Sequence, residues 1–204
     1  MNIRKTLALA AAIIVGGIGL AGCSSSANNG SQPAPTLQTP TSELTGVLAS
    51  HGLEDLDAVE IVDTLDQTPI TERPSDLMAS VRPNELVLTT ASGEETPMAL
   101  PDDQFYLSFA PYVDQTHDCY FHSLTTCMGE LSDQDFDVQI VNSDTGEAIV
   151  DETLTSFDNG FVGVWLPKGI EGELSVEYEG KSGSVDISTI SDDDATCLTT
   201  LQLS

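Results

Sequence analysis

Basic side chains are scarce in this sequence, and their scarcity excludes a whole class of partner. The 204 residues contain 6 Lys and Arg against 33 Asp and Glu, which gives a formal net charge of −27 at pH 7. A protein that binds nucleic-acid phosphates needs a basic face, so we expect no nucleic-acid partner. Solubility accounts for most of the acidity, although a negative field also concentrates cations near the surface.

The sequence also lacks the short motifs of several enzyme classes. It contains no glycine-rich phosphate loop, no H-E-x-x-H zinc motif and no G-x-S-x-G nucleophile elbow. The absence of C-x-x-C argues against a thioredoxin-type redox site. The acidic stretch that starts at Asp133 is not a calcium loop of the helix-loop-helix type, because Val138 and Asp144 stand where such a loop needs Gly and Glu.

The N-terminus has the pattern of an export signal. Arg4 and Lys5 precede an apolar run that is too short to span a bilayer. The run ends in the letters LAGC, whose last residue is Cys23, and this ending resembles the lipobox of bacterial lipoproteins. That resemblance implies cleavage before Cys23 and a lipid on it. We therefore expect a signal peptide over residues 1–22, a flexible tether over 23–41 and a protein anchored at the outer face of the cytoplasmic membrane or cell envelope.

Hydrophobic periodicity divides the rest of the chain into two parts. Residues 42–82 carry apolar residues at helical spacing, and this pattern includes a third short helix that would start at Pro74. From Asn84 onward, apolar and polar residues alternate in short runs between Gly-, Asn- and Asp-rich turns, which indicates a β-sandwich. The predicted fold class is α+β, with a small helical N-terminal region over 42–98 and an antiparallel, β-sandwich-like domain over 99–204.

The chain has four cysteines, and their number limits the roles that they can have. If Cys23 carries a lipid, then Cys119, Cys127 and Cys197 remain, which is an odd number for an exported protein. An odd count in a thiol-oxidising compartment implies a free reactive thiol, a bridge between molecules, or a site that uses all three. Three thiolates are also what a trigonal site for a soft metal needs.

Two of these cysteines belong to a dense cluster of potential metal ligands. The spacing is His117-x-Cys119-x-x-His122-x-x-x-x-Cys127, and Cys197 follows 70 residues later. Three ordinary explanations are open: a disulfide among the cysteines, a structural Cys₃His zinc site, or surface histidines without a ligand role. Copper is the sharper hypothesis, because Cu(I) favours thiolate and imidazole also suits copper. The same thiols can reduce Cu(II) and become a disulfide in the process.

The block PYVDQTHDCYFHSLTTCMGEL, together with the C-terminal ATCLTTLQL, resembles the CueP family of envelope copper-binding proteins. The three cysteines of the family fall on Cys119, Cys127 and Cys197, and both His117 and His122 lie inside the matching motif. The resemblance implies copper resistance, copper storage or delivery to a client protein, and reduction of Cu(II) by the thiols. It also implies a homodimer formed through the N-terminal region, with the metal site in the β-rich domain.

These observations predict a lipid-anchored protein that sequesters Cu(I) through Cys119, Cys127 and Cys197. His122, and after it His117, is the expected auxiliary ligand or the first contact for Cu(II), and zinc is expected to act as a surrogate metal. One alternative is a thiol–disulfide oxidoreductase of the envelope, which would need a thiol of depressed pKa; the sequence near Cys119 offers no cation that would supply one. The other is a structural lipoprotein with an incidental disulfide.

Overall fold

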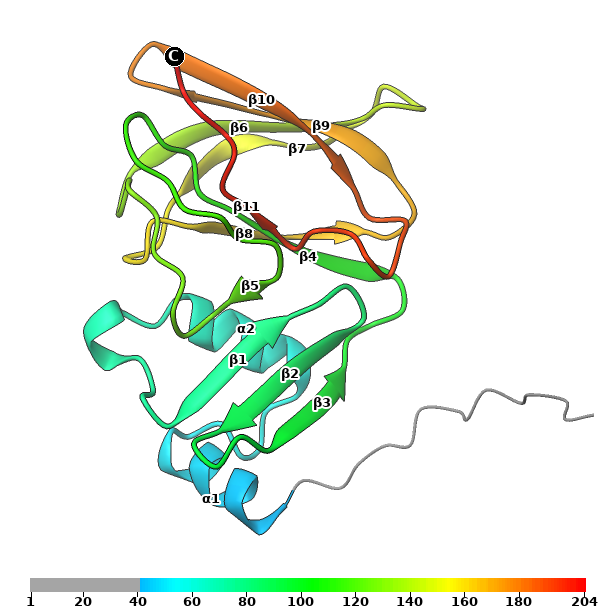
Figure 1. The fold of residues 1–204 in the computed structure, drawn as a ribbon. Helices are drawn as coiled ribbons and strands as arrows, with labels where there is room; N and C mark the ends of the chain where they lie inside the picture. Colours follow the sequence, from blue (N-terminus) through cyan, green and yellow to red (C-terminus); the bar gives the residue numbers. More distant parts are fainter. Residues whose placement is uncertain (1–40) are drawn as a thin grey trace, which may run out of the picture. The chain divides into compact units, whose positions relative to one another are not determined.

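The structure, a computed structural model, describes residues 41–204. In this part of the chain, two α-helices and one 3₁₀ turn come first and eleven strands follow (Figure 1). The predicted signal peptide, Cys23 and the tether up to residue 40 lie outside the described residues. No helix among the described residues is both long and apolar enough to cross a membrane.

Both helices start at side-chain caps. Helix α1 (Ser42–Ser50) begins at Thr41, whose hydroxyl accepts a hydrogen bond from the N–H of Leu44, and helix α2 (Ala58–Asp66) begins at a capping box formed by Asp57 and Glu60. The apolar faces of the two helices pack in one core with strands β1 and β2. Helix α2 ends at Asp66, whose side chain is fully buried, so this helix carries a carboxylate into the interior.

A four-stranded sheet, here called the first sheet, packs against these helices in the order β3-β2-β1-β5. Its strands are β1 (Leu77–Val81), β2 (Glu85–Thr90), β3 (Glu95–Ala99) and β5 (His122–Ser123). The helix predicted from Pro74 is wrong, because β1 occupies most of that segment. Leu77, Ala79 and Val81 are buried at a period of two, and that alternation suits a strand rather than a helical turn.

Two further sheets form the predicted sandwich. The second sheet has the order β10-β9-β6-β7 and the third has the order β11-β4-β8 (Figure 1). Their strands are β4 (Gln104–Phe109), β6 (Asp135–Asn142), β7 (Ala148–Thr155), β8 (Val162–Pro167), β9 (Glu171–Tyr178), β10 (Lys181–Ser188) and β11 (Cys197–Leu198). The two sheets share one apolar core. The α+β class and the sandwich-like C-terminal region are therefore confirmed, although β11 pairs with β4 in parallel.

Strand β4 contributes to both cores of the molecule. Phe105, Leu107 and Phe109 point into the sandwich core, as their alternation predicts. Tyr106 lies on the opposite face, where it joins the helix-backed core and packs in a tilted arrangement on Trp165 of β8, at 4.8 Å between ring centroids. The metal-ligand candidates described below gather beside this strand, where the two cores meet.

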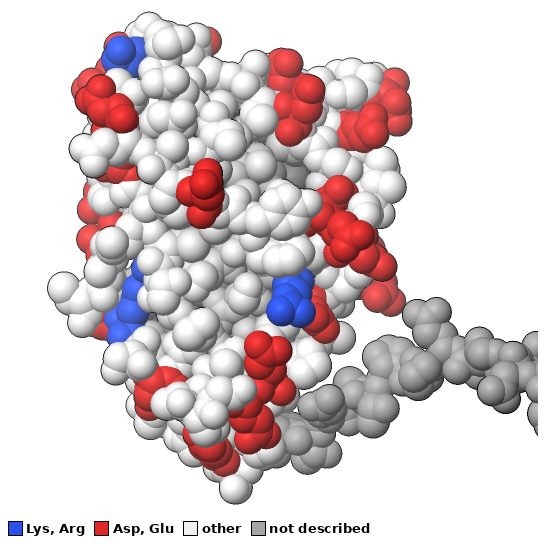
Figure 2. All heavy atoms as spheres, viewed as in Figure 1, with Lys and Arg blue, Asp and Glu red and all other residues white. Residues whose placement is uncertain are grey.

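The surface reflects the composition of the chain. Asp and Glu side chains are scattered over the face drawn in Figure 2, with only small patches of Lys and Arg between them. On β6 the apolar residues Phe136, Val138 and Ile140 are buried, whereas Asp135 and Asp137 are exposed. This acidic stretch is therefore the solvent face of a strand.

Candidate metal centre

Three segments that are distant in sequence hold His122 in place. Strand β5 pairs antiparallel with β1, which sets His122 opposite Val81. The backbone N–H of His122 donates to the Thr196 hydroxyl at 3.0 Å, and that hydroxyl donates to the Val81 carbonyl at 2.6 Å. The side chain of His122 is completely buried. This imidazole is therefore fixed by the fold rather than by a flexible loop.

The last strand brings Cys197 to the same place. In β11, Cys197 pairs in parallel with Ser108 of β4. The backbone N–H groups of Thr196 and Cys197 both donate to the carbonyl of Tyr120, at 3.0 and 3.1 Å. Cys119 precedes Tyr120 directly, so its sulfur meets that of Cys197, and the two form a disulfide. The last strand and the loop that contains Cys119 therefore lie side by side.

A tight turn returns the third cysteine to the cluster. The N–H of Cys127 donates to the carbonyl of Ser123 at 3.1 Å, and the guanidinium of Arg73 donates to the carbonyl of Cys127 at 2.8 Å. Just beyond, Gly129 and Gly160 pack backbone against backbone, so a Cβ at either one would overlap the other. The positive φ of Gly160, 77°, is a second reason for glycine at that position.

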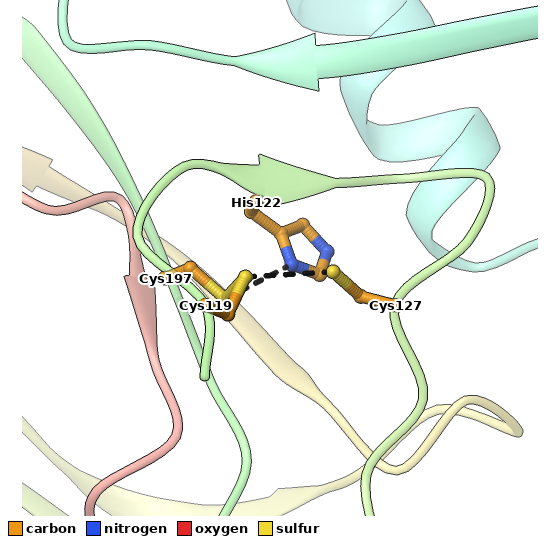
Figure 3. Close-up of side chains that lie close together, drawn as sticks. All are labelled: Cys119, His122, Cys127 and Cys197. Carbon is orange, nitrogen blue, oxygen red and sulfur yellow. Dashed lines mark hydrogen bonds between the residues drawn. A yellow bond between two sulfur atoms is a disulfide. The ribbon is translucent and has the colours of Figure 1, made fainter. Parts of the chain in front are cut away.

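The donor atoms of four predicted ligands converge. The sulfurs of Cys119, Cys127 and Cys197 and a ring nitrogen of His122 all lie within 4.8 Å of one another (Figure 3). The free sulfur of Cys127 is 3.5 Å from that of Cys119, and His122 Nδ1 is 3.8 Å from that of Cys197. Of the disulfides considered from the sequence, the structure contains the one between Cys119 and Cys197.

The fifth predicted residue lies apart from this group. His117 is exposed and meets the edge of the Phe161 ring at 6.1 Å between centroids. Phe161 is fully buried and also packs on His122, at 4.6 Å between centroids. His117 is thus outside the set of converging donors, beside a hollow that it lines together with Met128 and Glu130.

A residue that the sequence did not single out completes the centre. Asp66, at the end of α2, is fully buried, and its Oδ1 lies 2.9 Å from His122 Nε2. It also accepts hydrogen bonds from the Tyr106 hydroxyl at 2.6 Å and from the Asn159 amide at 3.0 Å. The sequence gives no signal for this role of Asp66, because Asp66 is one of 33 acidic residues and its helix contains no other residue of the site.

The buried charges shift the proton affinities of the centre. Burial lowers the pKa of His122, but the carboxylate of Asp66 outweighs it and raises that pKa to about 9. Burial raises the pKa of the Cys127 thiol, but a hydrogen bond and charge from His122, together with Arg73, bring it below its ordinary value. Burial also opposes ionisation of Asp66, whose pKa is nevertheless lowered by His122 and its hydrogen-bond donors. At all three groups, burial opposes the charged form and neighbouring partners of the centre favour it.

This arrangement suits two kinds of chemistry. When reduced, it offers three sulfurs and one imidazole nitrogen, a donor set that fits a soft or borderline cation. When oxidised, it holds a disulfide with a third sulfur in contact, which is a geometry for thiol–disulfide exchange. Both depend on the same few atoms.

The fold and this donor set define a small α+β protein with a cluster of cysteine and histidine donors that could hold a metal ion. A family model described as "Periplasmic copper-binding protein CueP" matches residues 60–202. A solved structure titled "Crystal Structure of S.CueP" is similar, with 44% sequence identity and a TM-score of 0.73 over 82% of this chain and 100% of that chain. No curated protein sequence matches.

The chain therefore belongs to the CueP family of periplasmic copper-binding proteins. The resemblance inferred from the cysteine and histidine blocks is confirmed. Copper is the metal of this family. Because the family is periplasmic, the protein belongs to the cell envelope.

Proposed function

We propose that this protein sequesters Cu(I) through the thiolates of Cys119, Cys127 and Cys197, with the imidazole of His122 as a fourth donor. The observation that carries the proposal is the convergence of these four donors within 4.8 Å of one another. Thiolate is the ligand that Cu(I) prefers, and three sulfurs are more than a single structural disulfide uses. His117, at the surface beside Phe161, is proposed as a first contact for incoming copper.

We further propose that the same cysteines reduce Cu(II). Two thiolates give one electron each to two Cu(II) ions, which yields two Cu(I) ions and one disulfide. The bridge between Cys119 and Cys197 is the product that this reaction would leave, and Cys127 would remain as a free thiolate. A return to the copper-binding state then requires two electrons from an external dithiol reductant of the envelope.

Anaerobic competition for Cu(I) tests the sequestration proposal. The purified, fully reduced protein is titrated with Cu(I) against a chelator of known affinity, in parallel with Cys127→Ser and Cys197→Ser. We expect tight one-to-one binding in the wild type and severe weakening in both variants. His51→Gln is the matched histidine control, because His51 pairs with Asp76 and lies outside the four-donor cluster. Wild-type binding that is weak and unaffected by either serine variant would refute the proposal.

One observation favours a second function, thiol–disulfide exchange with envelope proteins. The sequence offered no cation near Cys119, but the structure places His122 and Arg73 near Cys127, where they lower the pKa of its thiol. An exchange enzyme should reduce or reshuffle a scrambled protein substrate without metal, and Cys127→Ser should stop it. Metal-free exchange activity together with weak Cu(I) binding would make this second function the better description.

Membrane anchoring and dimerisation complete the proposal. We propose that a lipid on Cys23 anchors the chain, in which case Cys23→Ser should move the protein from the membrane fraction to the soluble periplasm.

We also propose that residues 42–98 pair two protomers. The side chain of Met78 is 57% exposed on β1 and offers an apolar contact there. Light scattering should report a dimer for the wild type and a smaller species for Met78→Glu.

A further inference from the structure

The contact between Asp66 and His122 joins two side chains that are both completely buried. Oδ1 of Asp66 lies 2.9 Å from Nε2 of His122, and each side chain is 0% exposed. An ionised carboxylate can only accept hydrogen bonds, so Nε2 must carry the proton in this contact. The other ring nitrogen, Nδ1, faces the sulfur cluster and is 3.8 Å from the sulfur of Cys197.

The carboxylate is itself held on several sides. Its Oδ2 accepts from the Tyr106 hydroxyl, and its Oδ1 also accepts from the side-chain amide of Asn159. The same amide donates to the main-chain carbonyl of Asp66 at 3.1 Å, so Asn159 fixes both the backbone and the side chain at the end of α2. Asn159 also accepts from the N–H of Phe161, the ring that packs on His122.

A glycine provides the room for this arrangement. A Cβ at Gly163 of β8 would overlap the Tyr106 hydroxyl and come within 2.9 Å of Asp66 Oδ2. The φ of Gly163 is not positive, so backbone conformation gives no reason for glycine here. Space for the hydrogen bond between Tyr106 and Asp66 is the physical reason that the structure supplies.

We propose that Asp66 is a positioning residue of the copper centre: it holds the Nε2–H tautomer of His122, directs Nδ1 at the three sulfurs and, through its negative charge, increases the basicity of Nδ1. The inference rests on the proposed function, because it assigns a role toward the metal that those sulfurs bind. Metal-ligating histidines commonly donate their second N–H to a carboxylate, which orients the ring and increases its basicity. Here that carboxylate comes from helix α2, whereas every candidate ligand comes after strand β3 in the sequence.

The test replaces Asp66 with Asn. The amide oxygen of Asn can occupy the place of Oδ1 and accept from His122 and Asn159, while its NH₂ faces a Tyr106 hydroxyl that can turn to accept. The substitution removes the charge but keeps the volume. Asp63→Asn is the matched control: it lies on the same helix and loses the same charge, but its carboxylate accepts from Trp165 Nε1 at 2.9 Å rather than from His122.

Cu(I) affinity is measured for the full-length, reduced protein and for both variants by competition with a chelator. We expect Asp66→Asn to bind Cu(I) about 10–100-fold more weakly, which is the usual effect of removing such an outer partner, and Asp63→Asn to bind as the wild type does. An unfolding midpoint for each variant shows whether a loss of fold contributes. Equal affinity of Asp66→Asn and wild type would overturn the proposal.

A second measurement reads the histidine directly. Cu(I) is diamagnetic, so ¹⁵N NMR of the His122 ring can be followed as the metal is added. We expect Nδ1 to shift on metal binding while Nε2 keeps its proton, a signature that a purely structural role for Asp66 would not produce. Metal on Nε2, or two ring nitrogens that do not respond, would refute the proposal even when the three cysteines bind Cu(I) tightly. If instead the wild type binds no Cu(I) through its cysteines, the proposed function fails first.

Discussion

The sulfur of Cys127 lies 3.5 Å from the sulfur of Cys119, which is already bonded to Cys197. This contact places the free sulfur of Cys127 beside the bridge between the other two cysteines. A thiolate at Cys127 can attack the Cys119 sulfur, break its bond to Cys197 and release Cys197 as the new thiolate. The exchange changes which sulfur is free but consumes no external oxidant or reductant.

The oxidised protein should therefore be a mixture of two forms, each with one disulfide, that interconvert by thiol–disulfide exchange. After incubation at neutral pH, acid quenching and alkylation, peptide mapping should find a Cys119–Cys127 bridge beside the Cys119–Cys197 bridge. Cys127→Ser removes the attacking thiol and should leave the Cys119–Cys197 bridge alone. A single bridge in the wild type after prolonged incubation would show that the contact does not lead to exchange.

The reactivity of Cys127 should depend on Arg73. The guanidinium binds the Cys127 carbonyl, and its charge is one of the causes that lower the pKa of the thiol. Arg73→Gln should raise this pKa, so alkylation of Cys127 by iodoacetamide should be slower at neutral pH and its pH midpoint should move upward. Arg82→Gln is the control, because Arg82 pairs with Glu85 instead. Identical pH profiles for Arg73→Gln and the wild type would contradict this expectation.

Two glycine substitutions should have opposite effects on stability. Gly163→Ala forces a methyl group into the space of the Tyr106 hydroxyl, and overpacking of this kind costs about 1–3 kcal/mol of the free energy of unfolding. Gly46 lies inside α1, and a Cβ there meets nothing within 4 Å, so Gly46→Ala should stabilise the protein by about 0.5–1 kcal/mol. Urea denaturation of the oxidised protein measures both; stability equal to wild type in Gly163→Ala would mean that Tyr106 can move away freely.

The buried pair of Asp66 and His122 should give stability a defined pH window. The pKa of His122 is raised to about 9 from an ordinary value near 6.5, so its contribution is complete below about 6.5 and is lost as the pH rises through about 9. The pKa of Asp66 is lowered, so its contribution is present above about 3.9 and is lost on acidification.

The reference for this measurement is the double variant Asp66→Asn, His122→Gln, which cannot ionise at either position. The free energy of unfolding of the metal-free, oxidised wild type minus that of the double variant should be largest between about pH 4 and 6.5. A difference that stays constant from pH 6 to pH 10 would show that the pKa of His122 is not raised in the folded protein.

Much of the fold could be predicted because its strands bury one face. Phe136, Val138 and Ile140 alternate with exposed acids, and the structure places them in the sandwich core as expected. The segment from Pro74 was predicted wrongly, because the eight residues between Pro74 and Pro83 are too few to separate a helical period from a strand period. The segment forms strand β1 because its alternate residues are buried against the helices, which is an effect of tertiary structure.

Only the part of the centre that consists of rare residue types could be predicted from the sequence. Cysteine and histidine are rare in this chain, so their cluster is conspicuous, and the structure brings Cys119, Cys127, Cys197 and His122 together. Asp66 is chemically just as specific in its place, but it is one of many acids, and only the packing of α2 distinguishes it. His117 shares the motif with His122, yet it lies at the surface, and the ring of Phe161 packs against both histidines.

The long separation between Cys119 and Cys197 has a consequence for biogenesis. During export through a membrane channel from the N-terminus, Cys119 and Cys127 emerge together, and Cys197 follows after a further 70 residues. In an oxidising space we expect the first two sulfurs to pair before the third arrives, so the earliest bridge should be the one that the structure does not contain. Once β11 docks beside β4, the Cys197 thiolate should attack the Cys119 sulfur, release Cys127 and so form the bridge that the structure contains.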